Sequence, residues 1–199
     1  MKLQPLAWLF AAALSCTASI GSAQEAYLTQ IGSNNIGANF SAGTGNAQQL
    51  VQSGNANLGV QLVSGLSNAA TLAQAGQQNV ATIALVGLRN AATTVQLGMY
   101  NQARVGINGI NNSVNTLQSG VYNRSSVSLT GNDTDVSVSQ FGVGREVDLT
   151  INDRMVTSNA ATAQSQANGR FRVGVIQGRA DAPVSATITR LSNGTIVIN

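Results

Sequence analysis

The chain has 199 residues, a formal net charge of +3, no histidine and a single cysteine. This composition excludes a nucleophile–histidine triad and a zinc site of the usual ligands. The charge is too weak for a nucleic-acid-binding surface, and aromatic residues are only 4% of the chain, so an ordinary aromatic and leucine core is not expected.

Residues 1–23 have the features of a secretory signal peptide. Lys2 provides a positive start, residues 6–14 form an apolar stretch too short to span a bilayer as a helix, and small residues precede Gln24. We therefore expect cleavage after Ala23 and a mature chain of residues 24–199 that lacks cysteine. Lipidation at Cys16 stays an open alternative, since lipobox cysteines also follow small and apolar residues.

A 22-residue repeat occurs six times from residue 30 onward, and we assign residues 24–145 to this repeat region. Its copies begin at Gln30, Gln52, Gln74, Gln96, Gln118 and Gln140. A glycine follows two residues later, at Gly32, Gly54, Gly76, Gly98, Gly120 and Gly142. An asparagine follows three residues after the glycine, at Asn35, Asn57, Asn79, Asn101 and Asn123. Glycine and asparagine also recur midway between the copies, so each repeat has two unlike halves of equal length; a low-complexity tail would not hold this phase.

Each 11-residue half predicts one β-strand and one turn. In "QAGQQNVATIA", which begins at Gln74, glycine favours a turn over residues 76–78. From Asn79 the pattern has period two, so Asn79, Ala81, Ile83 and Leu85 should point to one side. We predict strands of about seven residues with turns of about four, which makes an all-β solenoid whose 22-residue strand–turn–strand coils stack in cross-β fashion.

Stacking such coils places identical residues above one another. The glutamines should form one ladder, the asparagines two, and aliphatic residues at Val63, Leu85, Ile107 and Leu129 a fourth. Amide ladders satisfy their own donors and acceptors, so they can be buried. Tyr100 and Tyr122 share one turn position and should stack near the surface. The two ends of such a stack are open sheet edges that recruit further strands unless they are capped.

The repeat loses its phase after Gly142, since Asp153 stands where the next glycine would fall. Ten charged residues lie in 145–199, against six in 24–144. We interpret 146–199 as a divergent C-terminal β-segment that ends in a hairpin with its turn over 191–194. Whether this segment caps the stack, tethers it or binds a partner stays open.

Periodic Gln-x-Gly-x-x-Asn, with a small residue two positions after the asparagine, resembles curlin repeats, the building blocks of curli, the amyloid fibres of bacterial biofilms. Gln74, Gly76, Asn79 and Ala81 match that pattern in one copy. The family's usual serine position carries Asn68 or Asn90, its closing glutamine is Leu85 or Ile107, and its Gly-rich mature N-terminus is absent.

The resemblance implies a structural, non-enzymatic subunit of extracellular fibres at the bacterial surface, with roles in adhesion and biofilm matrix. It implies self-assembly, other curlin-type subunits and a dedicated outer-membrane secretion machinery as partners, and no cofactor. Two alternatives stay open: a minor subunit that nucleates such fibres, and a secreted solenoid adhesin that does not polymerise.

Other function classes fit the sequence poorly. The acids Asp133, Asp135, Glu146 and Asp148 alternate as in solvated strands rather than as a catalytic carboxylate pair. The turns carry Asn, Gln, Ser and Gly rather than the aspartates of calcium-binding repeats. The threonines do not form one regular rank of the kind that ice-binding solenoids present.

Overall fold

The computed structural model describes residues 12–18, 24–152, 159–165, 169–176, 185–190 and 196–198, with side chains described within 24–151. All of its regular elements in these ranges are strands. In chain order they are β1 (Ala12–Ala18), β2 (Glu25–Ser33), β3 (Ile36–Thr44), β4 (Ala47–Asn55), β5 (Leu58–Leu66), β6 (Ala69–Gln77), β7 (Val80–Leu88), β8 (Ala91–Met99), β9 (Gln102–Ile110), β10 (Ser113–Val121), β11 (Arg124–Asn132), β12 (Thr134–Val143), β13 (Arg145–Asn152), β14 (Asn159–Ser165), β15 (Gly169–Ile176), β16 (Ser185–Arg190) and β17 (Ile196–Ile198).

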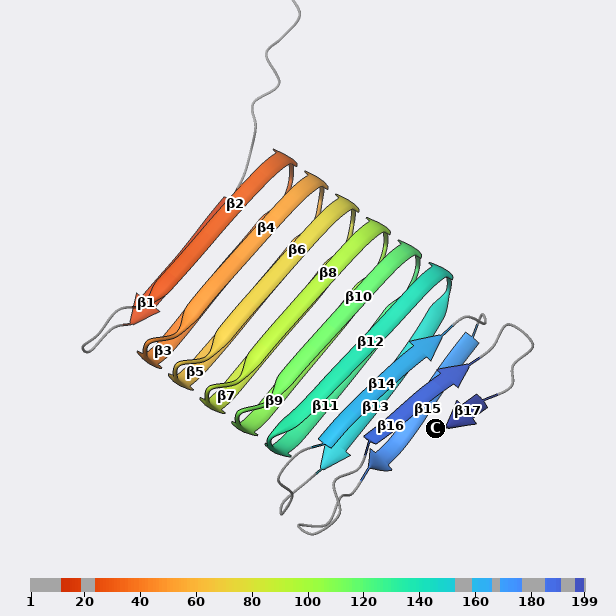
Figure 1. The fold of residues 1–199 in the computed structure, drawn as a ribbon. Helices are drawn as coiled ribbons and strands as arrows, with labels where there is room; N and C mark the ends of the chain where they lie inside the picture. The colour runs from red at the N-terminus through yellow and green to blue at the C-terminus, as the bar shows by residue number, and fades with distance from the viewer. Residues whose placement is uncertain are drawn as a thin grey trace, which may run out of the picture.

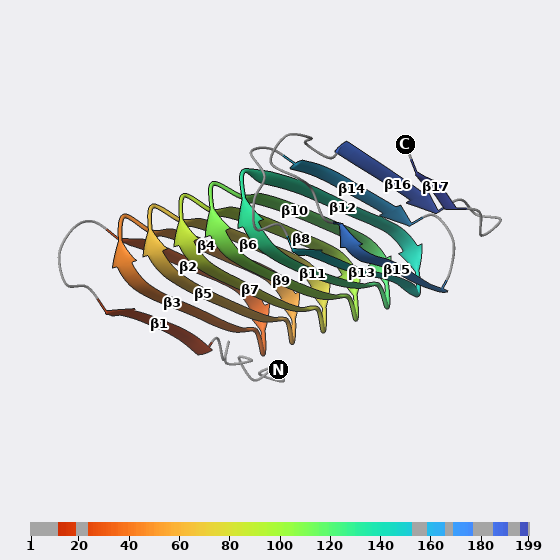
Figure 2. The same cartoon turned by 90° about the horizontal axis from the view of Figure 1, so that it is seen from below.

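The strands form two sheets that face each other. Odd-numbered strands make one sheet in the order β1-β3-β5-β7-β9-β11-β13-β15, and the other sheet runs β17-β16-β14-β12-β10-β8-β6-β4-β2. Each even strand and the odd strand after it form one coil, and the coils lie side by side along the stack (Figure 1). Viewed from below, tight turns join the two sheets along both edges (Figure 2). The predicted β-solenoid of about six 22-residue coils is confirmed.

Neighbouring strands within the repeats are parallel, and each residue pairs with the residue one full repeat later. Gln30 pairs with Gln52, and Gly54 with Gly76, and the same rule holds up to β12 and β13. Backbone pairing of identical positions explains why the period in the sequence tolerates no insertion. An insertion would shift the register of the strands, and identical side chains would then no longer lie above one another.

The inward face of each strand follows the predicted alternation. Asn79, Ala81, Ile83 and Leu85 are all fully buried, whereas Val80 between them is exposed. The interior is one continuous column of small and aliphatic side chains flanked by amides. Strands β2 to β11 are nine residues long rather than the predicted seven, because the turn glycines keep the strand's backbone pairing despite their positive φ.

The segment after residue 145 continues both sheets instead of leaving them. Arg145 pairs with Gly169, and Thr134 pairs with Asn159, so the offset between paired residues is here longer than one repeat. The coil is therefore longer, and this lengthening is why the sequence loses its phase. The last pair, β16 and β17, is antiparallel; the turn of the expected hairpin lies outside the described residues.

Strand β1 lies within the stretch expected to be a signal peptide. It pairs in parallel with β3, from Ala12 opposite Ile36 to Ala18 opposite Ala42. The expected cleavage site at Ala23 is outside the described residues. In this structure β1 covers the edge of β3, while β2 ends the other sheet with no described strand on its outer side.

Candidate functional site

The repeat glutamines form one hydrogen-bonded column inside the stack. Nε2 of Gln30 donates to Oε1 of Gln52 at 2.6 Å, and the same bond recurs at 2.6–2.8 Å down to Gln140. From Gln52 onward, Nε2 also donates across the interior to a backbone oxygen of the facing sheet, such as Ile36 O at 3.0 Å. These inner glutamines are buried, and their pairing removes most of the cost of burying an amide.

The asparagines form two columns, one at each edge where the sheets meet. In the first column Oδ1 of Asn57 accepts from both the backbone N and Nδ2 of Asn79, each at 3.1 Å. Nδ2 of Asn79 also donates to the carbonyl of Gly98 in the next coil, at 2.9 Å. The column runs through Asn35, Asn57, Asn79, Asn101 and Asn123, and the second through Asn46, Asn68, Asn90 and Asn112.

The two kinds of column have opposite polarity along the stack. A glutamine donates its Nε2 to the coil that follows it, as Gln74 does to Gln96. An asparagine accepts through its Oδ1 from the coil that follows it, as Asn57 does from Asn79. Consequently the last coil must offer an acceptor to glutamine and a donor to asparagine, and the first coil is left with a free glutamine oxygen.

The turn glycines are required by both conformation and contact. Gly76 has φ of 120°, and a Cβ built on it would lie 1.9 Å from the carbonyl oxygen of Gly98. The same clash with the next coil's glycine recurs at Gly32, Gly43, Gly54, Gly65, Gly87, Gly98, Gly109 and Gly120. Gly142, the last predicted turn glycine, also has positive φ, and there the crowding comes from the Arg145 side chain.

A second left-handed position in the turns was not anticipated from the sequence. It lies two residues after the glycine and is held mostly by residue types that rarely adopt it, with φ of 52–59°. Tyr100 is one of them, and its backbone N donates to the carbonyl of Gln77 in the preceding coil at 3.0 Å. This bond between coils offsets the strain of a left-handed residue; only the constant spacing from the glycine could have indicated it.

The C-terminal end of the repeats is closed by backbone groups. Arg145 stands where the next asparagine would fall, and its backbone N donates to Oδ1 of Asn123 at 3.1 Å. Thr134 does the same for Asn112 at 3.1 Å. Nε2 of Gln140 donates to the carbonyl of Arg145 at 3.1 Å, because the register places Ser165 rather than a glutamine beside it.

At the N-terminal end of the repeats, no described strand lies beyond β2 in its sheet. Oε1 of Gln30 is buried and has no hydrogen-bond donor among the described residues. Leu28 is only partly buried, whereas Leu50 and Leu72, the residues in register with it, are fully buried. Both features follow from the lack of a described strand before β2 in its sheet.

The interior is more polar near this end of the repeats. Asn39, Gln48 and Gln61 point inward, and each has a side-chain oxygen without a partner among the described residues. In later coils the register of Gln61 continues with Ile83 and Val105. The sequence analysis did not single out these amides. They are polar at positions where later coils carry apolar residues, but they keep the period-two alternation. Each unpaired oxygen costs the coil that holds it some stability.

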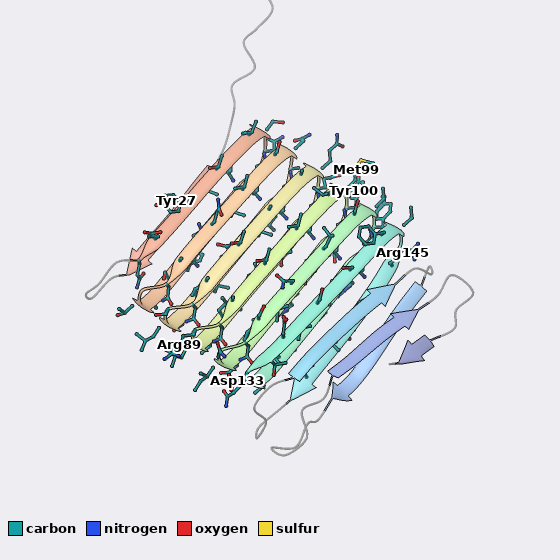
Figure 3. All side chains as sticks on the ribbon, viewed as in Figure 1. Tyr27, Arg89, Met99, Tyr100, Asp133 and Arg145 are labelled. Carbon is teal, nitrogen blue, oxygen red and sulfur yellow. The ribbon has the colours of Figure 1, made fainter. Side chains whose placement is uncertain are left out.

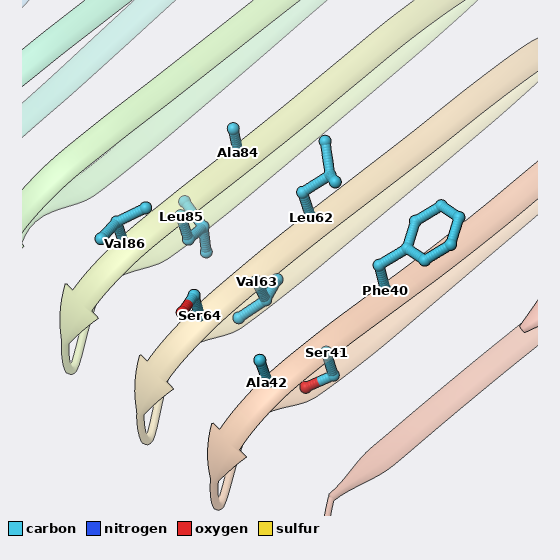
Figure 4. Close-up of a pocket in the computed structure, with 9 residues that line it drawn as sticks. All are labelled: Phe40, Ser41, Ala42, Leu62, Val63, Ser64, Ala84, Leu85 and Val86. Atoms are coloured by element: carbon cyan, nitrogen blue, oxygen red, sulfur yellow. The ribbon is translucent and has the colours of Figure 1, made fainter. Parts of the chain in front are cut away.

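The outer face of the odd-numbered sheet is apolar over its first coils. Phe40, Leu62, Ala84 and Val86 line a groove there (Figure 4). Beyond it the same face carries Arg104 and Arg124 on the following strands.

The two turn tyrosines lie together as predicted. Tyr100 and Tyr122 stack with ring centroids 4.8 Å apart and planes 13° apart, and Figure 3 labels Tyr100 at one turn edge. Their positions one repeat apart place one ring above the other. The contact adds an aromatic pair to the amide columns at that edge.

Asp133 lies in the turn before β12, and Asp135 lies on that strand. Oδ1 of Asp133 accepts from Nδ2 of Asn111 at 2.7 Å in a turn. Asp135 is exposed on β12. Within the part of the chain that the structure describes, no three His, Cys, Asp or Glu side chains gather as metal ligands, and no helix is suited to cross a bilayer.

The family comparison agrees with this geometry. A model described as the curlin associated repeat matches residues 109–142, which span β10, β11 and most of β12. No curated protein and no solved structure matches the chain significantly.

Proposed function

We propose that this chain, in which residues 109–142 match the curlin associated repeat, is a structural subunit of extracellular curli-type amyloid fibres. In this proposal it joins other subunits by stacking its end strands in parallel register, and the fibres serve adhesion and biofilm matrix. The role is structural and needs no cofactor. Export of residues 24–199 through a dedicated outer-membrane secretion machinery is part of the same proposal.

The observation that carries the proposal is the in-register column of glutamines. Each coil presents to the next the groups that it receives from the one before, as Gln52 does between Gln30 and Gln74. An interface between two chains can therefore repeat the interface between two coils. The strand spacing of such a stack is that of cross-β fibres.

Fibre assays on residues 24–199, transferred out of denaturant, test this function. We expect thioflavin T fluorescence to rise after a lag that preformed fibres of the same chain shorten. Fibre diffraction should give a meridional reflection at about 4.7–4.8 Å. A stable β-rich monomer that neither seeds nor joins curlin-type fibres would instead identify a non-polymerising adhesin.

A minor subunit that starts or ends fibres is the second candidate. It is favoured by the closed C-terminal end, where Gln140 donates to Arg145 and not to a further glutamine. A minor subunit would accelerate fibre formation by another curlin-repeat chain at low molar ratio while elongating poorly alone. A major subunit would elongate alone without limit.

A further inference from the structure

The two ends of this stack differ in what they offer to another chain. At the N-terminal end the buried Oε1 of Gln30 lacks a donor among the described residues. In the following rungs that oxygen accepts from the Nε2 of the preceding glutamine, as Gln52 accepts from Gln30. The donor that would pair with this oxygen is therefore an amide N–H at the glutamine position of a preceding coil.

Apolar burial is incomplete at the same end. Leu28 is packed against the core from one side only, while Leu50 and Leu72 in its register are fully buried. Tyr27 and Ile31 on the outer face of β2 are each 61% exposed. A preceding coil would cover Leu28 as β4 covers the other side, and it would extend the sheet beyond β2, its last described strand.

A second copy of this chain can stack there, but the joint is incomplete, because the described part of its C-terminal end offers no column glutamine beyond Gln140. Its even-numbered sheet ends at β17, which is antiparallel to β16, so the parallel pattern is interrupted. Its glutamine column stops at Gln140, which faces Ser165. The pairing of β13 with β15 also shifts register between Leu149 and Ile151.

We propose that β2 and β3 form the docking edge for a different curlin-repeat chain, one whose last coil still carries glutamine at the column position. That coil adds in parallel register, donates its amide to Oε1 of Gln30 and covers Leu28. This inference rests on the proposed fibre function and gives the joint a direction: the N-terminal end of this chain meets the C-terminal end of its partner.

Strand β1 determines whether the β3 part of this edge is accessible. In the full chain β1 occupies the edge of β3, from Ile36 to Ala42. Removal of residues 1–23 would uncover β3 beside β2, which has no described strand on its outer side. The edge strands of both sheets would then be free to pair. In this proposal, β1 covers the β3 half of the docking edge until residues 1–23 are removed.

The test uses a synthetic one-coil peptide with the sequence of residues 91–112, which carries a column glutamine, two strands and their turn. The peptide bears a photo-crosslinker, and cross-links to residues 24–199 are mapped by mass spectrometry. We expect them on residues 25–44. Cross-links on 169–198, or spread over both ends, would overturn the proposal, as would no binding at all.

Three variants sharpen the test. Gln30→Ala should weaken peptide binding about fivefold, the effect of one buried amide hydrogen bond, and Leu28→Ala should weaken it independently. Thr29→Ala, on the exposed face of the same strand, is the matched control and should bind normally. The full-length chain should bind more weakly than residues 24–199, and circular dichroism checks that each variant is folded.

The outcomes separate this inference from the fibre function. If residues 24–199 form or join fibres but the peptide docks at the C-terminal end, the fibre function stands and the docking edge is wrong. If Gln30→Ala and Thr29→Ala bind alike, the unpaired oxygen plays no part and the inference fails. If neither fibres nor peptide binding is seen, both fail.

Discussion

Asn79 donates its backbone N and its Nδ2 to Oδ1 of Asn57 in the preceding coil, each at 3.1 Å. One side-chain oxygen thus binds the backbone and the side chain of the next coil together. Oδ1 of Asn79 in turn accepts the same two bonds from Asn101, so the arrangement repeats along the stack. The stability of the stack should depend on these columns as well as on its apolar core.

The first prediction concerns Asn79→Ala. This substitution removes the donor to Asn57 and Gly98 and the acceptor for Asn101. It should lower the free energy of unfolding by about 3 kcal/mol, since several buried groups lose their partners. Gln77→Ala, at an exposed position of the same turn, should change it by less than about 0.5 kcal/mol. Equal effects in denaturant titrations would argue against the asparagine column.

The second prediction compares two glycines of one turn. Gly43 has φ of 110°, and a Cβ there would lie 2.0 Å from the carbonyl oxygen of Gly65. Gly45 has φ of 66°, and its Cβ would meet nothing closer than 3.5 Å. The equivalent residue in the next coil, Ser67, carries a side chain at φ of 56°.

Gly43→Ala should therefore cost more than about 3 kcal/mol or prevent folding, and Gly45→Ala only about 1 kcal/mol. Unfolding midpoints of the two variants provide the measurement. A tolerated Gly43→Ala would mean that neighbouring coils do not approach as closely as the structure places them.

The third prediction concerns two buried glutamines with different surroundings. Oε1 of Gln61 has no partner among the described residues, and its Nε2 donates to the carbonyl of Gln49 at 2.9 Å; Gln52 is paired with Gln30, Gln74 and the Ile36 carbonyl. Gln61→Ile should raise stability by up to about 1 kcal/mol, because removing an unpaired oxygen and extending the register of Ile83 outweigh the loss of one bond to the Gln49 carbonyl.

Gln52→Leu should lower stability by about 2–3 kcal/mol, because it leaves Nε2 of Gln30 and Oε1 of Gln74 without a partner. Hydrogen exchange of β2 to β5 should slow in Gln61→Ile and accelerate in Gln52→Leu. A stabilising effect from both substitutions would show that shape, and not hydrogen bonding, governs this column.

The fourth prediction is a coupling energy between Tyr100 and Tyr122. Their rings stack at 4.8 Å, so a double-mutant cycle with alanine should give about 0.5–1 kcal/mol. The cycle between Tyr27 and Tyr122 should be additive, because Tyr27 lies at the other end of the repeats (Figure 3). Additivity in both cycles would mean that the contact between the Tyr100 and Tyr122 rings does not contribute to stability.

Periodicity predicted the fold well because the coils repeat without insertion. Asn79, Ala81 and Ile83 point inward as expected, since side chains alternate in any strand and the phase is constant. The glutamine and asparagine columns could be predicted, because stacked coils place equivalent residues above one another. Strand length was less accurate, because the sequence signals a glycine turn but not that Gly76 still takes part in sheet pairing.

Other features depend on distances that spacing alone does not give. The left-handed backbone of Tyr100 or Arg89 is held by a bond to the preceding coil, against the residue's own preference. The direction of the glutamine bonds, and hence the unpaired oxygen of Gln30, follows from the placement of the facing sheet. The longer coils after Arg145 became visible only from their pairing with β15.

The buried positions between residues 24 and 151 hold amides, hydroxyls and alkyl groups, and none of them carries an ionisable side chain. Acidification therefore leaves every bond of the interior columns with the same protons that it has at neutral pH. A material built by extending this stack should keep its strength in acid or brine, where assemblies held by ion pairs loosen. The strength of such a material would therefore stay nearly constant when the pH or the salt concentration of its surroundings changes.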